Sequence, residues 1–220
     1  MVEYKKQIYN GIKKELKIKP IQVFANESCG FKCLKLLFNY YHVDFSIIGD
    51  SLSKLQKFSS PVWITDLGKL ALDLGFEVSI FTYSSTIFEP AWLSTNQFQF
   101  ERLLAQSKTK NVYLNQARKS ILKFIKSGGK LHRKIINPLV IKSYLKKQHP
   151  VLLAVSSAVI HQTSMTGGHF IVVQGYCDRN FIILNPQRQA FKKEIINQDR
   201  LLYALYQWGS WAMVLRKKKN

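Results

Sequence analysis

The sequence predicts an α+β fold in which helices come first and an antiparallel sheet follows. Three observations predict it. Residues 28–41 carry apolar side chains at helical spacing. The last third of the chain has short β-branched and aromatic runs separated by turns. The two kinds of segment are segregated along the chain rather than alternating, which is the α+β order. The 220 residues suit a single domain, residues 1–220, with a basic helical insertion at about residues 84–136.

The elements of the first part follow in order. Residues 1–19 form a basic amphipathic segment that we expect to be an exposed helix. Residues 28–41 form the clearest helix, with Ser28 as its N-cap. A second helix covers residues 65–74 and ends before a glycine, and a strand covers residues 76–82.

The second part starts with the segment of different composition, residues 84–136, which predicts one or two polar helices and a Ser-Gly-Gly loop. Asn137 and Pro138 predict an N-cap and a first helical residue, and this helix runs to about residue 148. The strands expected after it cover residues 151–156, 170–176, 181–184 and 211–216.

Composition limits the class of protein. The sequence is 46% hydrophobic and 13% aromatic, which predicts a packed core. Residues 151–158, the longest apolar stretch, are too short to cross a bilayer, and residues 1–19 lack the apolar part of a secretory signal. We therefore expect a cytoplasmic protein. The three cysteines are too few for a disulfide framework and lack zinc-site spacing, so no metal and no cofactor are expected.

The net charge is the outlying property. Lys and Arg number 33 and Asp and Glu number 13, which gives +20 at pH 7. Such a field attracts nucleic acid, anionic membranes or acidic proteins, although a lysine-rich surface without a function is the simpler explanation. Residues 101–150 contain a single acid, Glu101, and these 13 bases: 102, 108, 110, 118, 119, 123, 126, 130, 133, 134, 142, 146 and 147.

Cys29 is the candidate nucleophile. It starts the helix of residues 28–41, where the macrodipole and the free backbone N–H groups are expected to lower the pKa of a thiol. Gly30 lets a substrate approach closely, and the amide of Cys29 can face a developing oxyanion. A buried structural thiol is the alternative for a lone cysteine, and it is the reading that we expect for Cys33 and Cys177.

His169 and Asn185 complete the candidate site. His169 follows two glycines at the edge of an apolar strand, and Asn185 closes the next strand, before a proline. A tight turn between these strands brings the two side chains together, so Asn185 can orient the imidazole. Taken singly, each has an ordinary explanation, a histidine in a sheet and a turn-forming asparagine. The remaining histidines are expected at the surface: His42, His132, His149 and His161.

Three sequence blocks resemble the bacterial peptidase C39 and C39-like family of the papain superfamily. They are Ser28-Cys29-Gly30-x-x-Cys33-Leu34, the run of residues 168–176 with sequence GHFIVVQGY, and Ile183-Leu184-Asn185-Pro186. Residues 66–82 also resemble a family element. The resemblance covers residues 20–83 and 137–216 and omits residues 84–136. It implies a papain-like fold, in which a nucleophile helix packs on a C-terminal antiparallel sheet, and a Cys29-His169-Asn185 triad.

The sequence departs from the family pattern at three places. Asn185 replaces the usual Asp, which makes the triad papain-like. His42 replaces the glycine that follows the paired tyrosines. The family's oxyanion glutamine lies six residues before the cysteine, where this chain has Val23. We favour Gln22, one place away, as the oxyanion donor, with Asn26 as the other candidate.

The resemblance implies a thioester at Cys29 but leaves its acceptor open. Water would make the protein a C39-like peptidase, like the family members that cut leader peptides after a double glycine. An amine would make it an amide-forming acyltransferase, like the relatives in natural-product biosynthesis that take acyl groups from carrier proteins. Carrier proteins are acidic, so the basic insertion narrowly favours the acyltransferase.

The expected partner is therefore an acidic protein such as an acyl carrier protein, or else a peptide substrate. We expect it to dock on Lys119, Lys123 and Lys126, which share a face if residues 115–126 are helical. A third hypothesis is a non-catalytic basic binding module. Nucleic acid is not the expected ligand, because the sequence has no recognised nucleic-acid motif.

Overall fold

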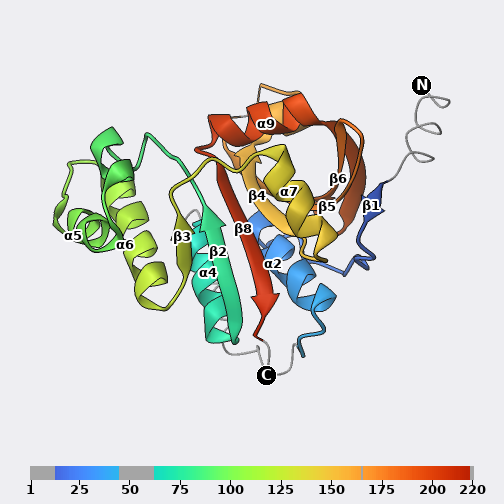
Figure 1. Cartoon of the computed structure of the whole chain (residues 1–220). Helices are drawn as coiled ribbons and strands as arrows, with labels where there is room; N and C mark the ends of the chain where they lie inside the picture. The colour runs from blue at the N-terminus through green and yellow to red at the C-terminus, as the bar shows by residue number, and fades with distance from the viewer. Residues whose placement is uncertain (1–12, 45–61, 165, 219–220) are drawn as a thin grey trace.

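A computed structural model describes residues 13–44, 62–164 and 166–218 of the chain (Figure 1). It has a mixed α+β architecture with one large sheet. The strands run in the order β3-β2-β8-β4-β5-β6-β7, and β1 pairs with β5 beside this path. Their bounds are β1 Lys14–Glu15, β2 Phe76–Phe81, β3 Lys130–His132, β4 Val151–Ser156, β5 Gly168–Cys177, β6 Asn180–Pro186, β7 Phe191–Asn197 and β8 Trp211–Lys217.

Helices pack on this sheet and beside it. The helix α2 packs against β5, α4 packs against β2, and α9 packs against β4. Figure 1 shows α5 and α6 together at one side of the molecule, beyond β3. The helix bounds are α2 Cys29–Tyr40, α4 Ile64–Asp73, η2 Pro90–Ser94, α5 Gln97–Gln106, α6 Val112–Lys126, α7 Pro138–Lys146, α8 Ser157–His161 and α9 Gln198–Gln207.

The strand pairs that position the site are antiparallel. The strand β5 pairs with β4 on one side and with β6 on the other, and β6 pairs with β7. Near Gly175 the register between β5 and β6 shifts by a bulge. A Cβ at Gly175 would lie 2.5 Å from the carbonyl oxygen of Lys14. Glycine therefore allows β1 to pair with β5 beside the bulge.

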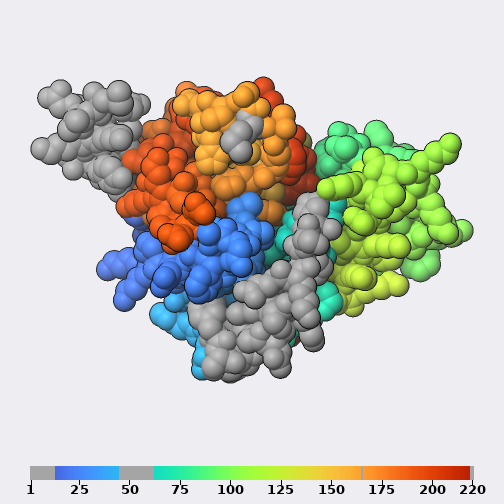
Figure 2. Space-filling view, turned by 180° about the vertical axis from the view of Figure 1, so that it is seen from behind, coloured from blue at the N-terminus to red at the C-terminus, as the bar shows by residue number. Residues whose placement is uncertain are grey.

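Residues 84–136 form a lobe that shares the core of the protein. Figure 2 shows this segment as a bulge beside the main body. Its buried apolar side chains, among them Phe88, Phe100 and Phe124, belong to the same hydrophobic cluster as Ile80 and Leu67. A buried network also joins α6 to α4: Thr65 Oγ1 lies 2.6 Å from Ser120 Oγ, which donates to Asp66. The insertion is therefore anchored to the sheet-covering helix α4.

Most of the predicted elements are found. Ser28 caps α2 by accepting a hydrogen bond from the Phe31 amide, and Asn137 caps α7 in the same way through the Val140 amide. The helix predicted to start at residue 65 starts at Ile64, and the helix predicted to reach residue 148 ends at Lys146. His42, which replaces the family's glycine, has a φ of 53°. A residue with a side chain is strained in that left-handed region, whereas glycine adopts it at no steric cost.

Other expectations were wrong. Residues 14–15, placed in an N-terminal helix, form β1, while residues 1–12 of that helix lie outside the described residues. The sequence reading missed β3, β7, α8 and α9. His132 and His149 are half-buried rather than at the surface: the ring of His132 stacks on Phe81 and the Nδ1 atom of His149 lies 3.1 Å from a tyrosine hydroxyl. In the part of the chain that the structure describes, no helix has the length and apolarity to span a membrane.

Candidate active site

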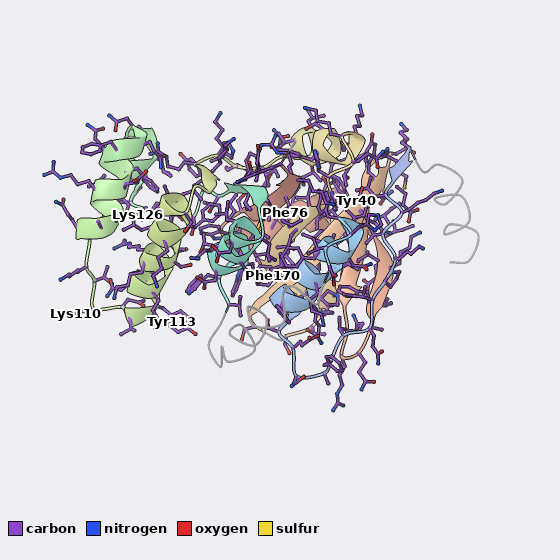
Figure 3. All side chains as sticks on the ribbon, turned by 90° about the horizontal axis from the view of Figure 1, so that it is seen from below. Tyr40, Phe76, Lys110, Tyr113, Lys126 and Phe170 are labelled. Atoms are coloured by element: carbon purple, nitrogen blue, oxygen red, sulfur yellow. The ribbon has the colours of Figure 1, made fainter. Side chains whose placement is uncertain are left out.

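Cys29 is the first residue of α2 and is half-buried. Its position exposes the thiol to the unpaired amides of the first helical turn. The helix lies on β5 next to Phe170: a Cβ at Gly30 would come within 2.9 Å of the Phe170 ring, and the Cys33 thiol lies 3.4 Å from the Phe170 carbonyl oxygen. Figure 3 shows Phe170 beside α2 near the centre of the molecule. Cys29 therefore faces the strand that carries His169.

Three charged residues around Cys29 hold the start of α2 in place. The Glu27 carboxylate accepts from the Phe24 amide at 2.9 Å and pairs with Lys35 Nζ at 2.8 Å. Lys32 is buried and its ammonium donates to the carbonyl oxygens of Gln187 and Arg188, which follow β6. These contacts were missed, because in the sequence the two lysines resemble ordinary surface residues. They fix α2 against the end of the strand that carries Asn185.

Burial raises the pKa of the Cys29 thiol above its ordinary value. The amides of Phe170, Gly30 and Cys29 and the charge of Lys32 oppose the shift without reversing it. The expectation that the helix start would lower this pKa was therefore wrong, because the loss of solvation outweighs the stabilisation by the amides. Cys29 is a protonated thiol at neutral pH and needs a base to become a nucleophile.

His169 and Asn185 lie together across the β5–β6 hairpin. In this hairpin Val172 pairs with Leu184, so continuing the register sets Asn185 opposite Ile171, two residues from His169 on the same face. His169 Nε2 lies 2.7 Å from Asn185 Oδ1. The ring nitrogen donates and the amide oxygen accepts, which leaves Nδ1 as the proton acceptor.

Glu194 fixes the orientation of the Asn185 amide. Asn185 is 1% exposed, and its Nδ2 donates to Glu194 Oε1 at 3.2 Å. Because the amide nitrogen faces a carboxylate, the amide oxygen faces the imidazole. Glu194 lies on β7 and pairs with Lys192 Nζ at 3.4 Å. Sequence reasoning missed Glu194 because it did not predict β7.

Burial lowers the pKa of His169 below its ordinary value. The hydrogen bond with Asn185 and the charge of Glu194 raise it, while His161 and Lys32 lower it further. The ring of His161 lies 5.0 Å from that of His169. His161 is exposed, as expected, but it stands beside the candidate site rather than apart from it. His169 is thus a neutral base at pH 7.

Neither predicted oxyanion side chain lies at the cavity next to Cys29. Gln22 and Asn26 are both exposed, and neither is among the described residues that line the cavity. The donors that the structure brings to the thiol are backbone amides, those of Cys29, Gly30 and Phe170. The side-chain donor stays an open prediction.

A cavity of about 460 Å³ adjoins Cys29. Its size is in the range of small-molecule sites. The lining comes from α2, α4, α6, β4, β5 and β8 and the segments next to them: Ser28, Cys29, Gly30, Val62, Trp63, Ile64, Thr65, Ile87, Tyr113, Ala117, Ile121, Ala154, Gly168, Phe170, Trp208 and Trp211. No cluster of three or more metal-ligating His, Cys, Asp or Glu residues is present among the described residues.

The predicted docking lysines lie on α6, which includes the whole of residues 115–126 as predicted. Lys119, Lys123 and Lys126, called the α6 lysines below, are all exposed. Figure 3 shows Lys126 at one end of α6 and Tyr113 at the other. Not every base of the insertion is at the surface, because the buried Arg118 donates to the Ile87 carbonyl oxygen and lies over the Trp92 ring.

Comparisons with known proteins are sparse. No protein-family model matches the chain, and no curated protein matches it. One solved structure with a local likeness is a Bacillus anthracis protein assigned as a C39-like peptidase, with 16% sequence identity and a TM-score of 0.30. The aligned part covers 38% of this chain and 49% of that chain, about half its length. At these values the likeness carries no argument about activity.

Proposed function

We propose that this protein is a papain-like cysteine enzyme that holds an acyl group as a thioester on Cys29. The single observation that carries the proposal is the His169–Asn185 hydrogen bond of 2.7 Å on the strand against which Cys29 is packed. A thiol at a helix start, a neutral imidazole and an amide that fixes the imidazole are the parts of a nucleophile, a base and an orienting group. The three sequence blocks that resemble C39-like enzymes contain the same three residues.

The pKa directions suggest how the thioester forms. His169 accepts the thiol proton as Cys29 attacks the acyl carbon, and a C–S bond forms. The imidazolium then gives the proton to the leaving group as the bond between the acyl carbon and the leaving group breaks. In the second half, His169 takes a proton from the acceptor, which attacks the thioester, and the Cys29 thiolate leaves and is reprotonated by His169. In this proposal the amide of Cys29 donates to the oxyanion in both halves.

The acceptor that we propose is an amine, which makes the enzyme an amide-forming acyltransferase supplied by an acidic carrier protein. The exposed α6 lysines support it, because a cluster of positive charges on one face suits an acidic partner. Hydrolysis of a peptide by the same thioester chemistry is the second candidate. It is favoured by the family resemblance, since the named members of that family are peptidases.

The test follows the products of two reactions. Acylated carrier protein and an amine are incubated with the wild type, Cys29→Ala and His169→Ala, and a peptide is incubated in parallel. We expect amide formation that requires Cys29 and that falls by several orders of magnitude in His169→Ala. Peptide cleavage with the same dependence, and no amide, would favour the peptidase. No reaction in either assay would contradict the enzyme and leave the basic binding module.

A further inference from the structure

The cavity beside Cys29 is built almost entirely of apolar and aromatic side chains. Trp63, Ile87, Ile121, Phe170 and Trp211 form much of its wall. Gly168, the residue before His169, also lines the cavity, and a Cβ there would lie 2.5 Å from the indole nitrogen of Trp208. The Trp208 ring thus covers the backbone next to His169, and the cavity extends from Cys29 to this point.

Three residues of the lining carry hydroxyl groups, and those of Thr65 and Ser28 are already engaged by the protein. Thr65 Oγ1 lies 2.6 Å from Ser120 Oγ, and Ser28 Oγ accepts from the Phe31 amide at 3.3 Å. A peptide backbone in this space would lose its bonds to water without finding a matching set of partners, which is costly. A hydrocarbon chain needs no such partners. The lining therefore suits the apolar part of a substrate better than a peptide backbone.

The insertion supplies one wall of the cavity. Tyr113, Ala117 and Ile121 lie on α6 and line it, while the α6 lysines are exposed on the same helix. The Ser120 bonds to α4 hold this wall in place. Residues 84–136 thus build part of the cavity in addition to carrying the positive charge.

We infer that the acyl group carried by Cys29 is a hydrocarbon chain and that this cavity is its binding site. The inference rests on the proposed thioester chemistry and adds the class of acyl group to it. The carboxyl carbon lies at Cys29 Sγ and the chain extends between α4 and α6. Removing each methylene of the chain from water strengthens binding by about fourfold until the cavity is filled.

The experiment is a chain-length series of acyl thioesters, from acetyl to dodecanoyl, with the wild type and two matched variants. Ala117→Leu puts three more carbons into the cavity wall. Ala105→Leu makes the same change on the exposed side of α5, in the same insertion. We expect kcat/KM for enzyme acylation to rise about fourfold per methylene in the wild type and in Ala105→Leu. In Ala117→Leu the rise should stop at a shorter chain.

Tyr113→Ala provides a second variant, because Tyr113 is 53% exposed and its loss does not empty the core. It should weaken the longest chains severalfold and leave the shortest ones least affected. Acylation that is independent of chain length would overturn the inference while leaving the Cys29 chemistry intact. Faster acylation by a peptide ester with a large apolar side chain than by any straight chain would overturn it as well.

A binding measurement separates the inference from the proposed function. A fluorescent fatty acid is titrated into Cys29→Ala, with and without Ala117→Leu. Saturable binding that Ala117→Leu weakens at least tenfold would support the hydrocarbon site even if no thioester ever formed on the wild type. Absence of binding, or binding unchanged by Ala117→Leu, would overturn the site regardless of the activity at Cys29.

Discussion

Exchanging Asn185 for the aspartate that is usual in C39-like enzymes should destabilise this protein because of Glu194. The Asn185 amide nitrogen now donates to Glu194 Oε1 at 3.2 Å. In Asn185→Asp two carboxylates would face each other there. Two unit charges about 4 Å apart repel by about 4 kcal/mol at an effective dielectric constant of about 20. Lys192 beside Glu194 and the 26% exposure of the Glu194 side chain reduce this.

We therefore expect Asn185→Asp to lower the free energy of unfolding by about 2 kcal/mol at pH 8, or the Tm by about 4–8 °C. Repulsion raises the pKa of one carboxyl of the variant above its value in the unfolded chain. The folded variant then binds a proton more readily than the unfolded one, so the penalty is largest at high pH and shrinks as the pH falls towards 5.

Denaturant unfolding of four proteins measures the effect: wild type, Asn185→Asp, Glu194→Gln and the double variant. The double variant should recover most of the lost stability, because the amide introduced by Glu194→Gln can donate to the new carboxylate. An Asn185→Asp variant as stable as the wild type at pH 8, or a double variant no better than the single one, would refute the reasoning that Glu194 orients the Asn185 amide.

Three further predictions follow from the same geometry. Iodoacetamide should label Cys29 before the two buried cysteines, at a rate that still rises with pH above about 9 because burial raises the thiol pKa. Mass spectrometry that shows first labelling elsewhere would contradict the assignment. In the pH profile of kcat/KM, the midpoint of the acid limb should lie below about pH 6.5, because His169 must be neutral and burial lowers its pKa. A midpoint above this pH would indicate a resting thiolate–imidazolium pair instead. Reversing the α6 lysines to glutamate should slow the association of an acidic carrier protein at least tenfold and flatten the salt dependence of its rate in stopped-flow measurements. Turnover of a small thioester should be nearly unchanged. Equal loss for both substrates would show that these lysines are not a docking surface.

The helix α2 and the β5–β6 hairpin could be predicted because local signals specify them. Ser28 before an apolar periodic run marks the start of α2, and a turn between two apolar runs brings His169 and Asn185 together. These features depend on residues close in sequence. To place Cys29 near His169 and Asn185, the prediction needed one further assumption, that α2 packs on this hairpin.

The supporting contacts could not be predicted, because they depend on tertiary packing. Nothing local marks Glu194 as the partner of Asn185. A half-buried strand is expected to alternate apolar and polar residues, whereas β7 has two adjacent lysines, so the strand was not predicted. The direction of the Cys29 pKa shift depends on how deeply β5 buries the thiol, which the position at a helix start does not reveal. The part of the cavity wall that residues 84–136 supply was not predicted, because the prediction used the positive charge of this segment and not the buried face of α6.

The most direct test of the central claim is to locate the acyl group. The wild type is mixed with an acyl thioester, quenched in acid within seconds and digested, and the peptides are mapped by mass spectrometry. We expect the acyl mass on Cys29, its removal by hydroxylamine, and its absence in His169→Ala and Cys29→Ala. An acyl group on Cys33, Cys177 or a lysine, or acylation of Cys29 that is as fast in His169→Ala, would contradict it.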